Sequence, residues 1–211
     1  VLPPGSGKTL IGAEIARQIG RPVVVLTPNT AIQGQWAALW RSMSSPGGER
    51  LRVTEDRSLS GDVTVLTYQA IATFDDDAVS SGEAGLQTDR LHPDAADLLD
   101  RLAAGPAFTL VLDEAHHLAQ TWGVLLAELL ARLQAGRPPV VIALTATPRS
   151  RLTQQQAELT DQLFGPVLFS VGTPALVRDS VLAPFRELVR FVEPSQQEQR
   201  YLADSATRWR E

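Results

Sequence analysis

The opening residues of the chain are of the types that can hold the phosphates of a nucleotide. The stretch Leu2–Thr9 reads LPPGSGKT. A glycine-rich turn that leads into a helix points backbone N–H groups at an anion, and the helix adds the positive end of its dipole. Lys8 would then reach the β- and γ-phosphates, and Thr9 would bind Mg²⁺ through its hydroxyl. The predicted nucleotide-binding residues are Pro4, Gly5, Ser6, Gly7, Lys8 and Thr9.

A Gly/Pro-rich linker is the alternative interpretation of this stretch. The general phosphate-loop pattern has a glycine where Leu2 stands, so the chain departs from that pattern at one position. A linker, however, needs no amphipathic helix that starts at its lysine. Lys8–Ile19 has helical periodicity and is followed by Gly20, which is a good helix stop. The phosphate-binding interpretation is therefore favoured.

The tetrapeptide DEAH at Asp113–His116 supplies candidate carboxylates for the same chemistry. It follows an apolar stretch of strand composition, and a carboxylate at the carboxyl end of a buried strand lies at the sheet edge where ligands bind. We expect Asp113 to bind Mg²⁺ and Glu114 to orient and deprotonate an attacking water. An acidic pair is also favoured at any helix N-terminus, which is the structural alternative. The predicted catalytic residues are Glu114, Lys8 and Asp113, and the predicted metal ligands are Thr9 and Asp113.

Strands and helices alternate along the chain in a way that would bring these residues together. Three of the four predicted strands are continuously apolar, which is typical of a parallel sheet buried on both faces. The predicted strands are Pro22–Thr27, Asp62–Thr67, Phe108–Asp113 and Pro139–Thr145, and the predicted helices between them are Lys8–Ile19, Thr30–Arg41 with Asn29 as N-cap, and Thr121–Gln134. The alternation predicts an α/β fold with a doubly wound, mainly parallel sheet and helices on both faces.

The other segments are less regular. Phe74–Arg90 is acidic and contains glycine and serine, which predicts a mobile surface loop. Further predicted elements are a helix at Asp94–Ala104, a helix at Thr173–Phe185 that ends at Pro184, a strand at Arg186–Val192 and a polar helix at Ser195–Arg210.

Composition limits the possible functions. The chain has 211 residues, of which 44 % are hydrophobic, so it can bury a substantial core. It has no cysteine, which excludes disulfides and thiolate metal sites and fits a cytoplasmic protein. No apolar run approaches the ~20 residues that are needed to cross a membrane. The net charge of −5 argues against a broad basic surface for nucleic acid. Lys8 is the only lysine in the sequence.

Five segments, taken in order, resemble the first RecA-like motor domain of superfamily 2 DEAD/DEAH-box helicases. They are LPPGSGKT at Leu2–Thr9, VLTPNTAIQGQW at Val25–Trp36, VTVLTYQAI at Val63–Ile71, DEAH at Asp113–His116 and ALTATP at Ala143–Pro148. The TYQ segment and the later LAPF stretch look most like the branch of type III restriction subunits and excision-repair helicases. The resemblance implies a RecA-like P-loop domain that binds ATP and Mg²⁺.

The resemblance also implies roles for residues outside the nucleotide site. Coupling of the ATP state to domain movement falls to His116, Thr145 and Thr147, and contact with nucleic acid falls to Thr27, Pro28, Asn29, Thr67, Tyr68 and Gln69. Such contacts go mainly to phosphates through N–H and hydroxyl groups, so they need no basic surface. The alternative for both groups is that they merely end strands. For Trp36 and Trp40, packing on a helix face is favoured over stacking on bases.

The implied organisation is a helicase ATP-binding domain at residues 1–170 and, at 171–211, a connecting segment toward a second RecA-like domain. Arginine fingers from that second domain would complete the site. The sequence has no QxxGRxxR-like segment, so we expect it to be a piece of a longer protein that hydrolyses ATP slowly by itself. The predicted function is an ATP-dependent helicase or translocase that acts on DNA rather than RNA. The alternatives are a nucleotide-gated DNA-binding scaffold, a remodelling ATPase that does not unwind, and an unrelated P-loop enzyme such as a kinase.

Overall fold

The core of the molecule is one parallel sheet. The computed structural model describes residues 1–73, 87–115, 123–134, 137–146 and 163–184, and in addition Glu158, Asp161, Ser195, Glu198 and Tyr201. The strands in this part of the chain are β1 Val23–Thr27, β2 Val53–Thr54, β3 Val63–Thr67, β4 Thr109–Leu112 and β5 Val140–Ala143. They are ordered β2-β3-β1-β4-β5, and every neighbouring pair is parallel. The predicted α/β fold with a parallel sheet is confirmed.

The register of the central strands β1, β3 and β4 places their carboxyl ends side by side. Leu26 on β1 lies opposite Leu66 on β3 and opposite Leu112 on β4. Thr27 and Thr67 form the next pair, and Asp113 directly follows Leu112. The carboxyl ends of β1, β3 and β4 therefore meet at one edge of the sheet, which is where ligands bind in open α/β sheets.

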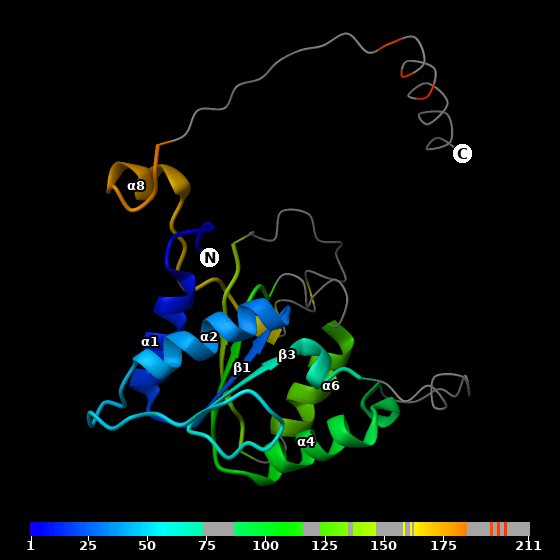
Figure 1. The fold of residues 1–211 in the computed structure, drawn as a ribbon. Helices are drawn as coiled ribbons and strands as arrows, with labels where there is room; N and C mark the ends of the chain where they lie inside the picture. Colours follow the sequence, from blue (N-terminus) through cyan, green and yellow to red (C-terminus); the bar gives the residue numbers. More distant parts are fainter. Residues whose placement is uncertain are drawn as a thin grey trace.

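Two pairs of helices cover the two faces of the sheet, as predicted. Helices α1 Lys8–Ile19 and α2 Thr30–Ser42 pack with Val23 and Val25, whereas α4 Pro93–Ala104 and α6 Gly123–Gln134 pack with Val24 and Leu26 (Figure 1). Successive strand residues point to opposite faces, so one strand feeds both cores. Helix α6 buries five leucines on the side that faces the sheet: Leu125, Leu126, Leu129, Leu130 and Leu133. None of the described helices is long and apolar enough to cross a membrane.

Local signals account for the helix ends at the site. Helix α1 begins after Gly7 and stops at Gly20, both of which have a positive φ (82° and 69°) that favours glycine. Helix α2 begins after Asn29, whose side-chain oxygen accepts a hydrogen bond from the Ile32 N–H over 3.0 Å. This is the predicted N-cap. Trp36 and Trp40 on α2 are buried, which confirms that both pack on the helix face.

Strand β5 differs from the prediction. Its continuous apolar sequence predicted burial on both faces, which holds for β1 and β4, but Val140 and Ala143 are exposed. The reason is that β5 is the edge strand of the described sheet. Beyond its end the Leu2 N–H donates to the Thr145 carbonyl over 3.0 Å, so the opening residues of the chain run beside it.

The helix predicted at Thr173–Phe185 is shorter than expected. Helix α8 spans Thr173–Arg178 and stops six residues before the proline that was expected to end it. Ser180 has a positive φ of 58°, and the N–H groups of Ser180 and Val181 donate to the carbonyls of Val177 and Leu176. This is the Schellman pattern, which satisfies the last carbonyls of a helix and ends it.

Other predicted elements agree in part. The loop prediction at Phe74–Arg90 is wrong for its last residues, because Gln87–Arg90 form the 3-10 turn η2, where the Thr88 N–H donates to Glu128. Strand β2 was not predicted. Ser195 and Glu198 cap one another as at the start of a helix. Residues 74–86, 121–122 and 185–192, with most of 195–210, lie outside the described residues.

Candidate functional site

The phosphate loop is shaped by two glycines. Gly5 and Gly7 have φ values of 76° and 82°, a region that residues with a Cβ rarely adopt. Between them Ser6 is buried, and its hydroxyl donates to the Pro3 carbonyl over 2.6 Å. Gly7 is the N-cap of α1 but has no side chain that could accept from the first N–H groups of the helix. The loop therefore presents helix-end donors of the kind that hold a phosphate.

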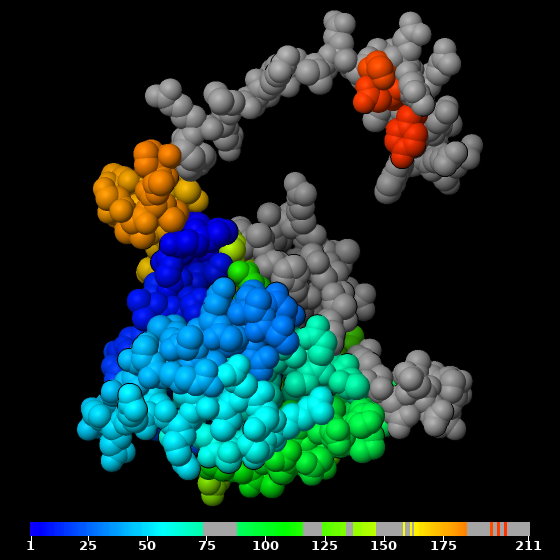
Figure 2. All heavy atoms as spheres, viewed as in Figure 1, coloured from blue at the N-terminus to red at the C-terminus, as the bar shows by residue number. Residues whose placement is uncertain are grey.

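The segment after α8 stands beside this loop. A Cβ added to Gly5 would lie 3.3 Å from Leu182 Cδ2, so that leucine packs against the glycine backbone. Figure 2 shows the same neighbourhood, with the orange residues of the α8 region next to the blue N-terminal residues. Side chains longer than glycine at position 5 would have to displace Leu182.

The residues Asp113–Ala115, called the acidic turn below, directly follow β4. The Asp113 N–H donates to the Leu26 carbonyl over 3.0 Å, and the Ala115 N–H donates to the Leu144 carbonyl over 2.9 Å. Glu114 between them has a positive φ of 52°. Such a backbone conformation is costly for a residue with a Cβ and is typical of functional sites. The turn is thus tied to both neighbouring strands while it presents the Glu114 side chain.

Asp113 is almost fully enclosed. Its residue is 4 % exposed, and its Oδ2 accepts a hydrogen bond from the Trp36 indole N–H over 2.8 Å. Its Oδ1 accepts from the Glu114 N–H over 3.0 Å, and the Tyr68 hydroxyl donates to its backbone carbonyl over 2.7 Å. Burial raises the pKa of the Asp113 carboxyl above its usual value, the Glu114 charge acts in the same direction, and the Trp36 hydrogen bond and Lys8 oppose them.

Lys8 joins the loop to the acidic turn. Its Nζ lies 3.1 Å from Glu114 Oε1, and the two side chains are 10 % and 25 % exposed. These residues are 106 positions apart in the sequence. The structure therefore brings the lysine of the phosphate loop and the carboxylates of the DEAH tetrapeptide to one edge of the sheet.

The predicted coupling residues are only partly described. The Thr145 carbonyl accepts from Leu2, and the preceding Leu144 carbonyl accepts from Ala115, so ALTATP begins between the phosphate loop and the acidic turn. His116 and Thr147 lie outside the described residues. Their roles and that of Thr145 stay predictions.

The residues predicted to contact nucleic acid divide into buried and exposed ones. Thr27 is fully buried, and its hydroxyl donates to the Leu66 carbonyl over 3.2 Å. Tyr68 is 5 % exposed, and burial raises the pKa of its hydroxyl well above the usual value, with the charges of Asp113 and Glu114 adding to the shift. Asn29 and Gln69 are exposed, while Pro28 and Thr67 are half-buried. A nucleic-acid strand that approached this edge of the sheet would contact the exposed and half-buried residues before it contacted the Tyr68 ring.

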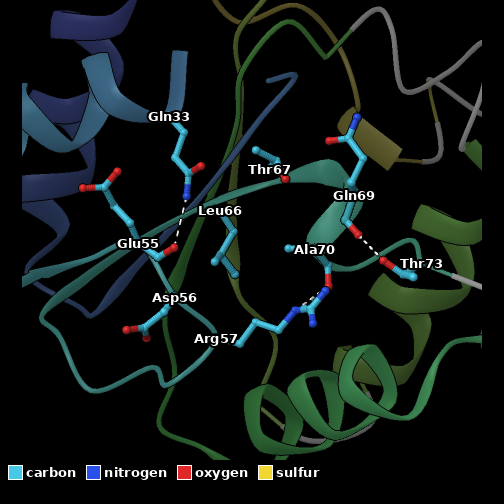
Figure 3. A pocket seen from close by; sticks show the side chains of 9 residues that line it. All are labelled: Gln33, Glu55, Asp56, Arg57, Leu66, Thr67, Gln69, Ala70 and Thr73. Carbon is cyan, nitrogen blue, oxygen red and sulfur yellow. Dashed lines mark hydrogen bonds between the residues drawn. The ribbon is translucent and has the colours of Figure 1, made fainter. Parts of the chain in front are cut away.

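A groove of about 500 Å³ opens beside the end of β3 (Figure 3). It is lined by Gln33, Glu55, Asp56, Arg57, Leu66, Thr67, Gln69, Ala70 and Thr73. Two of the nine, Thr67 and Gln69, were predicted to contact nucleic acid. The lining carries two carboxylates and one guanidinium, so phosphate binding here would depend on hydroxyl, amide and backbone groups more than on net charge.

Sequence reasoning missed two side chains that shape this groove. The Gln33 side-chain amide donates to the Val65 carbonyl over 2.7 Å and to the Glu55 carbonyl over 3.2 Å, and Arg57 Nε donates to the Ala70 carbonyl over 3.2 Å (Figure 3). Gln33 lies within the segment VLTPNTAIQGQW, so a closer look at that segment could have found it. Arg57 carries no sequence signal.

The chain matches a known family over most of its described fold. The family described as "Type III restriction enzyme, res subunit" matches residues 1–150. The chain belongs to this family. Membership of the res subunit family confirms the predicted resemblance to the first RecA-like motor domain of superfamily 2 helicases, and it makes the chain a helicase-type, ATP-binding motor domain. Helicase-family ATPases generally use ATP and Mg²⁺.

Among solved structures, the chain is similar to the helicase domain of Hef from Pyrococcus furiosus. The identity is 20 % and the TM-score 0.46, and the match covers 77 % of this chain and 32 % of that one. The chain thus spans about a third of the length of that structure. No curated protein matches the chain. The predicted division of this res-family chain near residue 170 stays a prediction.

Proposed function

We propose that this domain binds ATP with Mg²⁺ between the phosphate loop and the acidic turn and hydrolyses it to drive movement on a DNA strand. The observation that carries the proposal is the contact of Lys8 Nζ with Glu114 Oε1 at 3.1 Å, because both groups are needed at the γ-phosphate. A second RecA-like domain, which the helicase family implies as a partner, would supply the remaining charges.

The residues at this edge suit a magnesium nucleotide. Mg²⁺ prefers hard oxygen ligands, and the Thr9 hydroxyl and the Asp113 carboxylate are oxygen donors that would hold it. The uncapped start of α1 at Gly7 supplies backbone donors for phosphate oxygens. When bound, Mg²⁺ would neutralise charge that develops on the phosphate oxygens.

Once the nucleotide is bound, Lys8 and Glu114 would act one after the other. Phosphate oxygens compete with Glu114 for the Lys8 ammonium, so nucleotide binding would draw Lys8 away from the carboxylate. Glu114, released from this ion pair, would accept the proton of the attacking water. Glu114 suits this role better than Asp113, since the Glu114 side chain is 25 % exposed whereas Asp113 is only 4 % exposed.

The same edge would carry the nucleic acid. Asn29 and Gln69 are exposed beyond β1 and β3, and the groove beside Thr67 offers amide and hydroxyl groups. DNA is proposed over RNA because the TYQ segment and the LAPF stretch resemble the branch of restriction and excision-repair motors. The acidic net charge of −5 favours a narrow track over a broad basic surface.

The test is ATP hydrolysis by the natural full-length polypeptide that contains this chain. We expect single-stranded DNA to stimulate hydrolysis more than RNA of the same length, and the Lys8→Ala variant to show no stimulated turnover. Turnover that is independent of any nucleic acid would contradict the proposal, and transfer of phosphate to a small molecule would favour a kinase.

Unwinding and movement without unwinding need separate assays. Displacement of a triplex-forming strand reports movement along a duplex, whereas displacement of a paired strand reports unwinding. Triplex displacement that depends on ATP supports the proposed motor with or without strand separation. If ATP drives neither reaction in a protein that hydrolyses it on DNA, the scaffold or remodelling alternative is favoured.

A further inference from the structure

Asp113 is held from both faces of the sheet. Trp36 reaches its carboxylate from α2, within the core covered by α1 and α2, and Tyr68 belongs to the core covered by α4 and α6. The Trp36 indole donates to the side chain, and the Tyr68 hydroxyl donates to the backbone carbonyl. Each aromatic residue therefore fixes a different part of the same acid.

All three groups are shielded from water. Trp36 is 0 %, Asp113 4 % and Tyr68 5 % exposed. Hydrogen bonds to a charged group are stronger than neutral ones, and in a low-dielectric interior a carboxylate oxygen that loses its donor is strongly destabilised. The orientation of the Asp113 carboxylate is therefore set by the protein before an ion binds.

Tyr68 lies in one segment that is predicted to contact nucleic acid, and Trp36 lies on the helix that begins directly after the other such segment. Tyr68 lies between Thr67 and Gln69. Trp36 lies on α2, whose first turn is capped by Asn29. If a bound nucleic-acid strand shifts either segment, the movement would be transmitted to Asp113 through a single buried hydrogen bond.

We propose that Trp36 and Tyr68 are positioning residues that orient Asp113 for the magnesium ion and transmit the binding of a nucleic-acid strand to the nucleotide site. The inference rests on the proposed function, because it assumes that Asp113 binds the ion and that the ends of β1 and β3 meet the strand. It assigns a mechanical role to two residues that sequence reasoning treated as a packing residue and as a direct contact.

The chain offers a matched control for Trp36. Trp40 lies one turn further along α2, is 1 % exposed, and its indole N–H has no hydrogen-bond partner among the described residues. Trp36→Phe and Trp40→Phe remove the same indole group from the same core. Only the first removes a donor from Asp113. Tyr68→Phe is nearly isosteric and removes only the hydroxyl.

The experiment measures binding, so it does not depend on turnover. The natural full-length polypeptide is titrated with Mn²⁺, a paramagnetic substitute for Mg²⁺, in the presence of a non-hydrolysable ATP analogue, and free Mn²⁺ is followed by electron paramagnetic resonance. We expect Trp36→Phe to weaken Mn²⁺ binding about tenfold, which is typical when a partner of a metal ligand is removed. Trp40→Phe should stay within about twofold of the wild type, because no ligand loses a partner.

The same titration with single-stranded DNA tests transmission. Because coupling between two sites is reciprocal, DNA should change the Mn²⁺ affinity of the wild type. It should change the affinity of Trp40→Phe by the same factor, because Trp40 makes no hydrogen bond to Asp113. That factor should fall toward one in Trp36→Phe and in Tyr68→Phe. Should Trp36→Phe fail to fold, Tyr68→Phe carries the test by itself.

The outcomes separate the inference from the proposed function. A wild type that binds no Mn²⁺ with the nucleotide analogue would overturn the proposed function. A wild type that binds, together with Trp36→Phe and Tyr68→Phe variants that keep its Mn²⁺ affinity and its response to DNA, would overturn only the positioning role.

Discussion

The phosphate loop and the acidic turn face each other across the site but are held in different ways. In the loop, Ser6 bonds back to Pro3 through both its N–H and its hydroxyl, and Gly5 and Gly7 remain exposed. In the turn, Asp113 is 4 % exposed and is bonded to β1, α2 and η1, the 3-10 turn at Tyr68–Ala70. The Ser6 bonds that shape the loop are thus local, whereas the bonds from Leu26, Trp36 and Tyr68 that hold Asp113 come from distant parts of the sequence.

This difference separates two tasks within one site. Under the proposed function, the donors that would wrap around the nucleotide are left accessible, whereas the carboxylate that would orient the ion is fixed in advance, which avoids reorganisation during the reaction. Substitutions in the turn should therefore reduce turnover, and substitutions in the loop should reduce nucleotide affinity. The variants below test that separation, from the largest expected effect to the smallest.

Replacing Glu114 tests the chemical role of the turn. Glu114→Gln keeps the shape but cannot accept a proton, so DNA-stimulated kcat should fall by about 10²- to 10⁴-fold. Affinity for an ATP analogue should be retained, since the phosphate contacts come from the loop. Glu14→Gln is the control, because Glu14 pairs with Arg17 on α1 outside the site. A Glu114→Gln enzyme within tenfold of the wild type would contradict the assignment.

Replacing glycines of equal strain isolates the role of the loop. Gly7 and Gly20 both have a positive φ, and an added Cβ meets nothing within 4 Å at either. Alanine should cost about 1–2 kcal/mol of unfolding free energy at each site. Only Gly7→Ala should also weaken nucleotide binding, by about tenfold or ~1.4 kcal/mol. Chemical denaturation measures the change in stability, and calorimetric titration measures nucleotide affinity. Equal nucleotide affinities in Gly7→Ala and Gly20→Ala would show that Gly7 has no part in nucleotide binding.

Replacing Gly12 on α1 tests how tightly this helix packs against Leu144, the residue whose carbonyl holds the acidic turn. A Cβ at Gly12 would lie 2.5 Å from Leu144 Cδ1, and the Leu144 carbonyl holds Ala115. Alanine favours the helix by up to about 1 kcal/mol relative to glycine. At Gly12 the overpacking against Leu144 costs about 1–3 kcal/mol, so Gly12→Ala should on balance lower the free energy of unfolding. Gly34→Ala on α2, where the Cβ meets open space, should raise it by up to about 1 kcal/mol. Denaturant unfolding gives both values, and equal signs would show that α1 tolerates the added group.

Asn29 separates capping from strand contact. Asn29→Ala should lower the free energy of unfolding by about 1 kcal/mol, because the Ile32 N–H loses its acceptor. Asn29→Asp keeps the cap and adds a negative charge where a phosphate is predicted. It should leave stability near that of the wild type and weaken DNA binding, measured by fluorescence anisotropy. Unchanged DNA affinity in Asn29→Asp would limit Asn29 to its capping role.

Local signals explain what could be predicted from the sequence. Helix α1 was predicted with its observed bounds because Gly7 and Gly20 mark its two ends. The sheet was predicted because β1 and β4 are apolar on both faces, as buried parallel strands require. The convergence of Lys8 with the DEAH carboxylates followed from the rule that ligands bind at the carboxyl ends of such strands.

What could not be predicted depends on tertiary contacts. Strand β2 has two residues and only exists because it pairs with β3. The exposure of β5 depends on its place at the edge of the sheet formed by the described residues, which its apolar sequence does not encode. The Trp36–Asp113 hydrogen bond joins residues 77 positions apart. Neither residue carries a local pattern that reveals the other.

The central claim is that Lys8 and the Asp113–Glu114 carboxylates form one magnesium-nucleotide site. It is tested most directly by calorimetric titration of a non-hydrolysable ATP analogue into the natural polypeptide and into its Lys8→Ala variant, each with and without Mg²⁺. We expect saturable binding to the wild type that requires Mg²⁺ and is lost in Lys8→Ala. Binding of equal affinity in both proteins would contradict the account.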